Sequence, residues 1–163
     1  SMSKNSYQKL NCPISGLLSL VGDQWSLLII RDLLLGINRF DHIQRSLGLS
    51  RNILTQRLGQ LVEDGFATRK PIREGVNRWY YEPTEKSRQL LPVLLSMLQW
   101  GEEWTPNKNG RRMIAVDSRN GSAVRVELRR ESDGKRIQND DLSFKAGPGA
   151  DPAVKHRLGE FDS

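Results

Sequence analysis

The chain has 163 residues, of which 37% are hydrophobic and 27% charged, and its formal net charge is +6. This length indicates one domain, or one domain with a small appendage, and enough apolar residues to form a core. The positive charge suits nucleic acid or another anionic surface. Because no apolar run reaches the length of a membrane span and residues 1–10 lack the apolar core of a signal peptide, we expect a cytoplasmic protein with no membrane partner.

The single cysteine, Cys12, excludes an intrachain disulfide and a multi-cysteine zinc site. It precedes Pro13, a favoured first residue of a helix, and an apolar helical pattern continues from there to Gly22. A thiol at a helix N-terminus lies near a positive partial charge, which favours the thiolate and therefore oxidation or alkylation. Cys12 is thus a candidate redox sensor, and a small residue that merely fills the start of a helix is the alternative.

Two further helices are expected before residue 48. Residues 25–35 are apolar around nearly the whole circumference, which is typical of a helix at the centre of a core. Residues 39–47 predict a shorter helix with one apolar face, and Arg39 at its start is a candidate phosphate contact. Gly48 ends that helix just before Ser50, so this helix and the next one predict a helix-turn-helix.

The helix expected from Arg51 to Asp64 has clear boundaries, because Ser50 is a favoured N-cap and Gly65 a favoured C-cap. Its apolar residues recur at three- and four-residue spacings and predict one buried face, made of Ile53, Leu54, Leu58, Leu61 and Val62. Arg57 lies toward that apolar side. We therefore expect Arg57 to form a structural ion pair and not a base contact.

The opposite side of the same helix is polar and carries Arg51, Asn52, Thr55 and Gln56. Amide side chains can pair with adenine, and a guanidinium can pair with guanine or phosphate. This set, together with Ser50 at the helix start, predicts a surface that reads duplex DNA. A polar face that is merely solvated is the alternative.

Residues 66–72 and 79–82 are rich in aromatic and β-branched side chains and flank a polar turn that contains glycine, which predicts a β-hairpin. A helix followed by such a hairpin is typical of a winged helix. Between residues 45 and 78 there are seven Lys or Arg against three acidic residues, a local excess of +4. We expect Arg73, Asn77 and Arg78 in the turn to hold the DNA backbone.

Residues 84–104 predict a long helix capped by Thr84 and interrupted at Pro92 by a kink or a local break. Apolar residues cover more than one face of this helix, which favours a homodimer formed through it and the N-terminal helix. A monomer in which the C-terminal region covers the helix is the alternative.

Beyond the linker at residues 105–110 the helical periodicity stops. Alternating residues predict strands at 113–116, 124–130, 136–138 and 142–145, with turns at Asn120-Gly121 and Asp133-Gly134. We therefore expect three parts in the chain: residues 10–104 as a DNA-binding and dimerisation domain, residues 111–150 as a small β-rich module, and residues 151–163 as a disordered or short helical tail.

Several motifs in residues 10–104 resemble the HxlR family of bacterial transcriptional regulators, relatives of the MarR-type winged helices. They are Cys12-Pro13, Gly22-Asp23-Gln24-Trp25, Arg39-Phe40, Leu54-Thr55-Gln56-Arg57-Leu58, Glu63-Asp64-Gly65, Leu90-Leu91-Pro92 and Trp100-Gly101. The resemblance implies a homodimer on a roughly palindromic operator, with residues 50–64 in the major groove and residues 73–78 at the backbone or minor groove. It also implies oxidant or electrophile sensing at Cys12, as in some members. Gln24 stands where the family commonly has lysine, so one backbone contact there is expected to be weaker.

The C-terminal region resembles an extension of some HxlR relatives in which Cys-Gly-His and Cys-x-x-Cys-Gly precede a Gly-Pro-Gly-Ala ending and look like a metal knuckle. Here Asn120-Gly121-Ser122 and the segment 130–134 stand at those places, without a sulfur ligand. Because structural zinc needs about four nitrogen or sulfur ligands, we expect no metal in this module. Dimer support or an effector site is the role that we expect for it.

The function classes can be ranked from these residues. An enzyme is disfavoured, because the one cysteine and two histidines have no catalytic setting and no glycine-rich phosphate loop follows a strand. No cofactor is expected. The sequence predicts an α+β winged helix-turn-helix protein that binds double-stranded DNA as a homodimeric repressor and responds to oxidants through Cys12 or to a small-molecule effector. The alternative is a winged helix used for protein or RNA contacts.

Overall fold

The computed structural model describes residues 10–160, so the expectation about the first residues of the chain lies almost wholly outside the described part. The chain divides into two compact units, one formed by residues 21–125 and the other by residues 1–20 together with 126–163. None of the described helices is by itself long and apolar enough to cross a membrane, and the helices Pro13–Val21 and Ser26–Leu34 pass the same test only as a bent pair.

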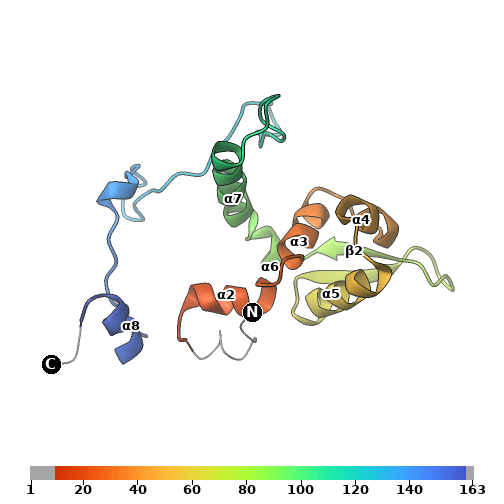
Figure 1. Ribbon diagram of the computed structural model, residues 1–163, viewed down its shortest axis with the longest axis horizontal. Helices are drawn as coiled ribbons and strands as arrows, with labels where there is room; N and C mark the ends of the chain where they lie inside the picture. The colour runs from red at the N-terminus through yellow and green to blue at the C-terminus, as the bar shows by residue number, and fades with distance from the viewer. Residues whose placement is uncertain (1–9, 161–163) are drawn as a thin grey trace. The chain divides into compact units, whose positions relative to one another are not determined.

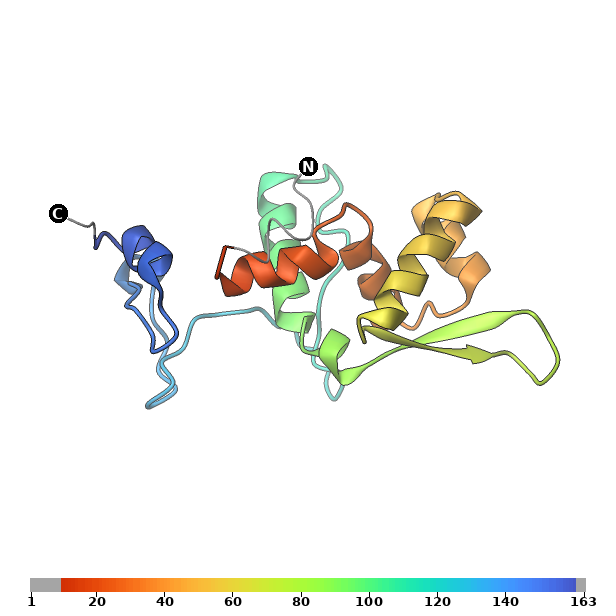
Figure 2. The same cartoon turned by 90° about the horizontal axis from the view of Figure 1, so that it is seen from below.

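The unit of residues 21–125 is a winged helix-turn-helix followed by a long helix (Figure 1). Its elements are α3 (Ser26–Leu34), α4 (Phe40–Leu47), α5 (Arg51–Glu63), β1 (Ala67–Pro71), β2 (Trp79–Pro83), α6 (Glu85–Arg88) and α7 (Leu91–Trp104). In Figure 2 the hairpin of β1 and β2, the wing, reaches beyond the ends of α4 and α5. The predicted α+β winged helix-turn-helix fold is confirmed.

The helix boundaries follow from local capping. The side chain of Ser50 accepts a hydrogen bond from the Ile53 N–H at 3.3 Å and starts α5, as expected. Gly48 ends α4 at φ 66°, a left-handed conformation that glycine adopts without the steric cost of a Cβ atom. This tight turn joins α4 to α5 and so fixes the direction of α5 relative to α4.

The core lies where α3 meets α4, α5 and the wing. Ile29 and Ile30 of α3, Ile43 of α4, and Leu54 and Leu58 of α5 have no exposed surface. The central position of α3 is therefore confirmed.

One prediction about the buried face of α5 is wrong, because Ile53 is 41% exposed. Leu54, Leu58 and Leu61 follow each other at four and three residues and face the core together. Ile53 lies about 100° around the helix from Leu54 and so leaves that face.

The two strands of the wing pair antiparallel, with Arg69 opposite Tyr81 and Pro71 opposite Trp79. Because side chains alternate along a strand, these four residues belong to one face of the hairpin. Lys70, opposite Tyr80, belongs to the other face. The Tyr81 N–H donates to the Asn38 carbonyl at 2.7 Å and ties the base of the wing to the segment that enters α4.

The helix predicted over residues 84–104 is broken, as the proline indicated. Thr84 caps α6 by accepting from the Ser87 N–H, and α7 begins at Leu91 with Pro92 in its first turn. Proline is tolerated there because the first N–H groups of a helix have no intrahelical acceptor. Within the described part of the chain, no residue of α7 is buried.

The other unit contains α2 (Pro13–Val21), the 3₁₀ helix η1 (Asn139–Asp141) and α8 (Pro152–Arg157). The Arg157 guanidinium donates to the Leu10 carbonyl at 2.7 Å, and the Asn11 side chain donates to the Gly149 carbonyl at 3.4 Å. These bonds join the two ends of the described chain. Within the predicted tail, α8 is a short helix, and residues 161–163 lie outside the described part.

The four strands predicted between residues 113 and 145 are not formed. Within residues 111–160 the only strand-like pairings are the isolated bridges Val116 to Ala123 and Arg129 to Arg136. The two predicted turns are present, with Gly121 at φ 74° and Gly134 at φ 70°. Each turn closes a short hairpin-like loop that has no third strand beside it and no buried face. Alternation of apolar and polar residues is therefore not enough to form a β-sheet here.

Candidate nucleic-acid interface

A cleft of about 540 Å³ lies between the start of α4, the start of α5 and the inner face of the wing. We call it the wing cleft. Four arginines, four residues with apolar or aromatic rings or chains, two further polar residues and one carboxylate line it: Arg39, Arg51, Arg69, Arg78, Phe40, Ile72, Trp79, Tyr81, Thr55, Asn77 and Asp41. The cleft therefore brings together five of the predicted DNA-binding residues, namely Arg39, Arg51, Thr55, Asn77 and Arg78.

The predicted reading face of α5 is open to solvent. Arg51, Asn52, Thr55 and Gln56 are all exposed. The Arg51 guanidinium lies 4.9 Å from the centre of the Phe40 ring, a cation–π contact that restricts where this side chain points. The Thr55 hydroxyl donates to the Arg51 carbonyl at 2.8 Å, so its lone pairs remain available as acceptors.

The inner face of the wing carries a contact that the sequence did not predict. The Arg69 guanidinium lies 3.9 Å from the centre of the Trp79 ring. The Trp79 indole N–H donates to the Asn77 side-chain oxygen at 3.2 Å and thereby holds the ring in place. Burial raises the pKa of Tyr81, and the Arg69 guanidinium beside its hydroxyl opposes that rise. Arg69 and Trp79 could be found from the sequence only if the strand register were known.

The outer face of the wing is charge-neutralised. Lys70 pairs with Glu82 at 3.1 Å between Nζ and Oε2, and this hydrogen bond raises the pKa of Lys70. Among the described residues Arg69 has no carboxylate partner. The positive charge of the two strands is therefore directed to the face that lines the wing cleft.

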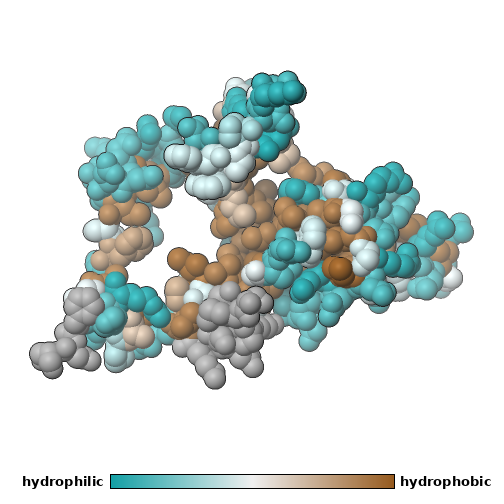
Figure 3. Space-filling view, in the orientation of Figure 1, coloured by the Kyte–Doolittle hydropathy of each residue, from teal (hydrophilic) through white to brown (hydrophobic). Residues whose placement is uncertain are grey.

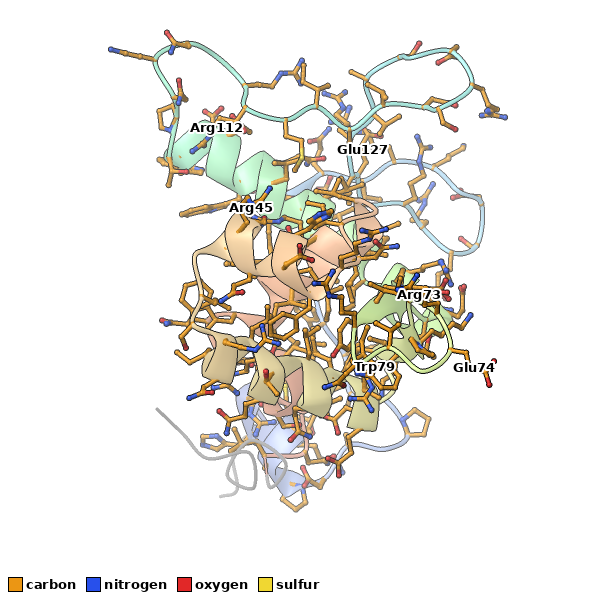
Figure 4. The ribbon with its side chains drawn as sticks, turned by 90° about the vertical axis from the view of Figure 1, so that its right-hand side faces the viewer. Arg45, Arg73, Glu74, Trp79, Arg112 and Glu127 are labelled. Atoms are coloured by element: carbon orange, nitrogen blue, oxygen red, sulfur yellow. The ribbon has the colours of Figure 1, made fainter. Side chains whose placement is uncertain are left out.

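The tip of the wing is a tight turn with Gly75 at φ 76°, closed by the Ile72 N–H on the Arg78 carbonyl at 2.9 Å. Arg73 and Glu74 belong to this turn, and the Glu74 side chain points away from Trp79 (Figure 4). Arg73, Asn77 and Arg78 are exposed, as a contact with a DNA backbone requires.

Arg57 forms the structural ion pair that was predicted for it, with 3.5 Å between its Nε and Asp23 Oδ2. Asp23 also accepts from the Trp25 and Ser26 N–H groups at 3.0 and 2.9 Å and starts α3. Burial raises the pKa of Asp23, but the hydrogen bonds from Ser26 and Trp25 and the charge of Arg57 outweigh it and lower the pKa overall. This pair links α5 to the start of the central helix.

The profile of the HxlR-like helix-turn-helix family matches residues 20–109. The chain belongs to this family. The HTH-type transcriptional regulator Rv3095 of Mycobacterium tuberculosis H37Rv, itself uncharacterized, is 40% identical over 93 residues, which are 57% of this chain and 59% of that protein. The chain therefore matches less than two thirds of the length of this HxlR-like relative. YybR of Bacillus subtilis 168, an uncharacterized HTH-type transcriptional regulator, is 31% identical over 63% of this chain and 83% of its own.

Two solved structures extend the comparison. PA1607, classed as a transcription factor, matches with a TM-score of 0.76 and 35% identity over 87% of this chain and 99% of its own. The oxidised form of the redox regulator HypR matches with a TM-score of 0.51 and 29% identity over 56% of this chain and 96% of its own. The similarity to PA1607 thus extends beyond residues 20–109, which the HxlR-like family profile matches.

The cysteine of this HxlR-like chain lies at the start of α2, and it is partly exposed. Hydrogen bonds from the Ser15 backbone and hydroxyl, and one from the Ile14 backbone, lower the pKa of the Cys12 thiol, and the charge of Arg157 adds to them. The lowered pKa raises the fraction of reactive thiolate at a given pH.

Arginine–aspartate pairs hold the two C-terminal turns that contain Gly121 and Gly134. Arg119 contacts Asp117 through two hydrogen bonds of 3.0 and 2.8 Å, and Arg130 contacts Asp133 through two of 3.1 and 2.7 Å. These hydrogen bonds from Arg119 lower the pKa of Asp117. Salt bridges therefore close these turns in the HxlR-like chain.

A second large cavity, about 530 Å³, lies between α3 and α7 and is lined mainly by leucines. Apolar side chains gather over the same two helices in Figure 3. On α7, Met97 is 51% exposed, Trp100 62% and Trp104 69%. This apolar surface is larger than isolated exposed residues would create.

Proposed function

We propose that this chain is a sequence-specific double-stranded DNA-binding transcriptional regulator without enzymatic activity that acts in the cytoplasm. The observation that carries the proposal is the wing cleft, where the reading face of α5 and the inner face of the wing present four arginines and a single carboxylate. This excess of positive charge favours binding of a polyanion such as the phosphate backbone of DNA. Membership of the HxlR-like family supports the same reading.

The residues divide between two kinds of contact. Arg51, Asn52, Thr55 and Gln56 on the exposed face of α5 read base edges in the major groove, where amide and guanidinium groups discriminate bases. A separate set at the ends of α4 and α5 and in the wing holds the sugar–phosphate backbone: Arg39, Ser50, Arg73, Asn77 and Arg78.

We further propose a homodimer that represses by occupying an inverted-repeat operator. The exposed apolar side chains of α7 supply one surface for a second copy. Ile14 and Leu18 of α2, which are 72% and 38% exposed, supply another in the other unit. Two copies would place their α5 helices about one DNA turn apart, roughly 34–36 Å.

Equilibrium binding to duplex DNA and duplex RNA of matched sequence separates this function from its alternative. We expect a preference for DNA, with affinity falling by about 10³-fold or more between about 50 and 200 mM salt if six or more phosphates are neutralised. Equal affinity for RNA would assign the winged helix to RNA. Absence of binding to both would assign it to protein contacts.

A second proposal concerns regulation through Cys12. The lowered pKa of its thiol supports oxidant or electrophile sensing, and HypR, a redox regulator, shares the fold. Because a lowered pKa keeps the thiolate populated at lower pH, alkylation of Cys12 should reach half its maximal rate at a lower pH than that of a free cysteine. Oxidant should weaken operator binding by the wild type and leave the Cys12→Ser variant unchanged. Identical responses of the two proteins would remove Cys12 as the sensor and leave a small-molecule effector.

A further inference from the structure

Arg69 is a cation of the wing cleft that neither the reading face of α5 nor the wing tip includes. Its guanidinium carbon lies 3.9 Å from the centre of the Trp79 ring, and its cross-strand neighbour is Tyr81. Trp79 is two residues from Tyr81 on the same face of β2, so it is the diagonal neighbour of Arg69. The side chain is therefore flanked by two aromatic residues.

Arg69 keeps hydrogen-bond donors for a further partner in this position, because the Tyr81 hydroxyl accepts from only part of the guanidinium. A guanidinium that stacks on a ring uses its face, so its N–H donors in the plane remain directed outward. The ring is itself held by the bond from its indole N–H to Asn77 at 3.2 Å. Because the guanidinium is already oriented, less side-chain entropy is lost when it binds an anion.

The adjacent cation on the strand shows the contrast. Lys70 points to the opposite face of the hairpin and pairs with Glu82 at 3.1 Å. Arg69 lines the 540 Å³ cleft together with Arg39 and Arg51, and Asp41 is the one carboxylate in that lining. An oriented, planar donor set in a cavity of this charge suits the oxygens of a phosphate group.

We propose that the wing cleft seats one phosphate of the DNA backbone, bound by Arg69, and that Trp79 is a positioning residue that holds the Arg69 guanidinium. This inference rests on the proposed function in duplex DNA binding. It adds a backbone contact at the inner face of the wing strand, separate from the contacts of the wing tip at Arg73 and Arg78.

Two single variants form a matched test on a duplex that the wild-type protein binds. Arg69→Gln should weaken binding by roughly 5- to 10-fold on specific and random DNA alike, and should reduce the slope of log affinity against log salt by about 1. Lys70→Gln removes the same charge from the other face and should change affinity by less than about 2-fold with the same slope as wild type. Equal losses of DNA affinity in the two variants would mean that Arg69 contributes only its charge. That result would overturn the proposed phosphate site.

Trp79 is tested by its conservative variant and by coupling. Trp79→Phe keeps an aromatic face and should retain most of the affinity, whereas Trp79→Leu should lose about as much as Arg69→Gln. The double variant Arg69→Gln/Trp79→Leu should lose little more than either single one, because both remove one contact. Circular dichroism melting identifies a variant that fails to fold, and Trp79→Phe with Arg69→Gln still decides the question in that case. Additive losses would overturn the positioning role.

The source of the phosphate is settled by ethylation interference. In wild type, ethylation of one backbone phosphate in each half-site should block binding, and in Arg69→Gln that sensitivity should disappear. Competition by inorganic phosphate beyond that of chloride at equal ionic strength, without an interference signal, would assign the cleft to a free anion and overturn the proposal. Failure of the wild type to bind any duplex contradicts the proposed function itself, whereas a normal wild type and an unaffected Arg69→Gln contradict only the phosphate seat.

Discussion

Gln56 is an exposed amide on the reading face of α5, one turn after Asn52. On that face it can pair with an adenine edge, so Gln56→Ala should cost about 1–3 kcal/mol of binding free energy on the operator and relax one base position. Equilibrium titration of the operator and its single-base variants measures both effects. Gln60→Ala is the control, because the Gln60 amide is already engaged by Asp64 at 3.1 Å. An equal loss of affinity on random DNA would show that Gln56 is no reader.

Ser50 has two proposed roles, as the N-cap that stabilises α5 and as a contact with the DNA backbone. Its side chain accepts from the Ile53 N–H at 3.3 Å, so Ser50→Ala should lower the free energy of unfolding by about 1 kcal/mol, measured by urea denaturation. Ser50→Asp keeps a capping acceptor and should retain that stability, but its charge should repel a nearby phosphate and weaken DNA binding. If Ser50→Asp bound DNA with wild-type affinity, Ser50 would not lie near the DNA backbone.

At the scale of elements, the sequence predicted the features that depend only on residues close to one another in the chain. The cap at Ser50, the helix end at Gly48 and the break at Pro92 each depend on a few neighbouring residues, and each was predicted from sequence. The stacking of Arg69 on Trp79 was missed, because it depends on the register between two strands. Alternation between residues 113 and 145 predicted strands that are absent, because a strand also needs a partner and a face to bury.

At the scale of the whole molecule, α7 presents an apolar surface that the described residues of its own unit leave uncovered. Because the described residues bury no residue of α7, Trp100→Glu should leave the fold intact while placing a charge in the proposed dimer interface. Sedimentation equilibrium should then detect a monomer, and operator affinity should fall by about 10-fold or more as the second half-site contact is lost. Glu103→Gln, an exposed polar change on the same helix, should remain dimeric. A Trp100→Glu dimer would place the interface elsewhere.

Selection from a random duplex DNA pool with the purified protein tests the central claim most directly. Two α5 helices held by one dimer should enrich an inverted repeat whose half-site centres lie about one turn, roughly 10 base pairs, or a multiple of it apart. The selected positions should include those that Gln56→Ala relaxes. If a folded, dimeric protein enriched no sequence, operator recognition would be contradicted. The winged helix would then bind another class of partner.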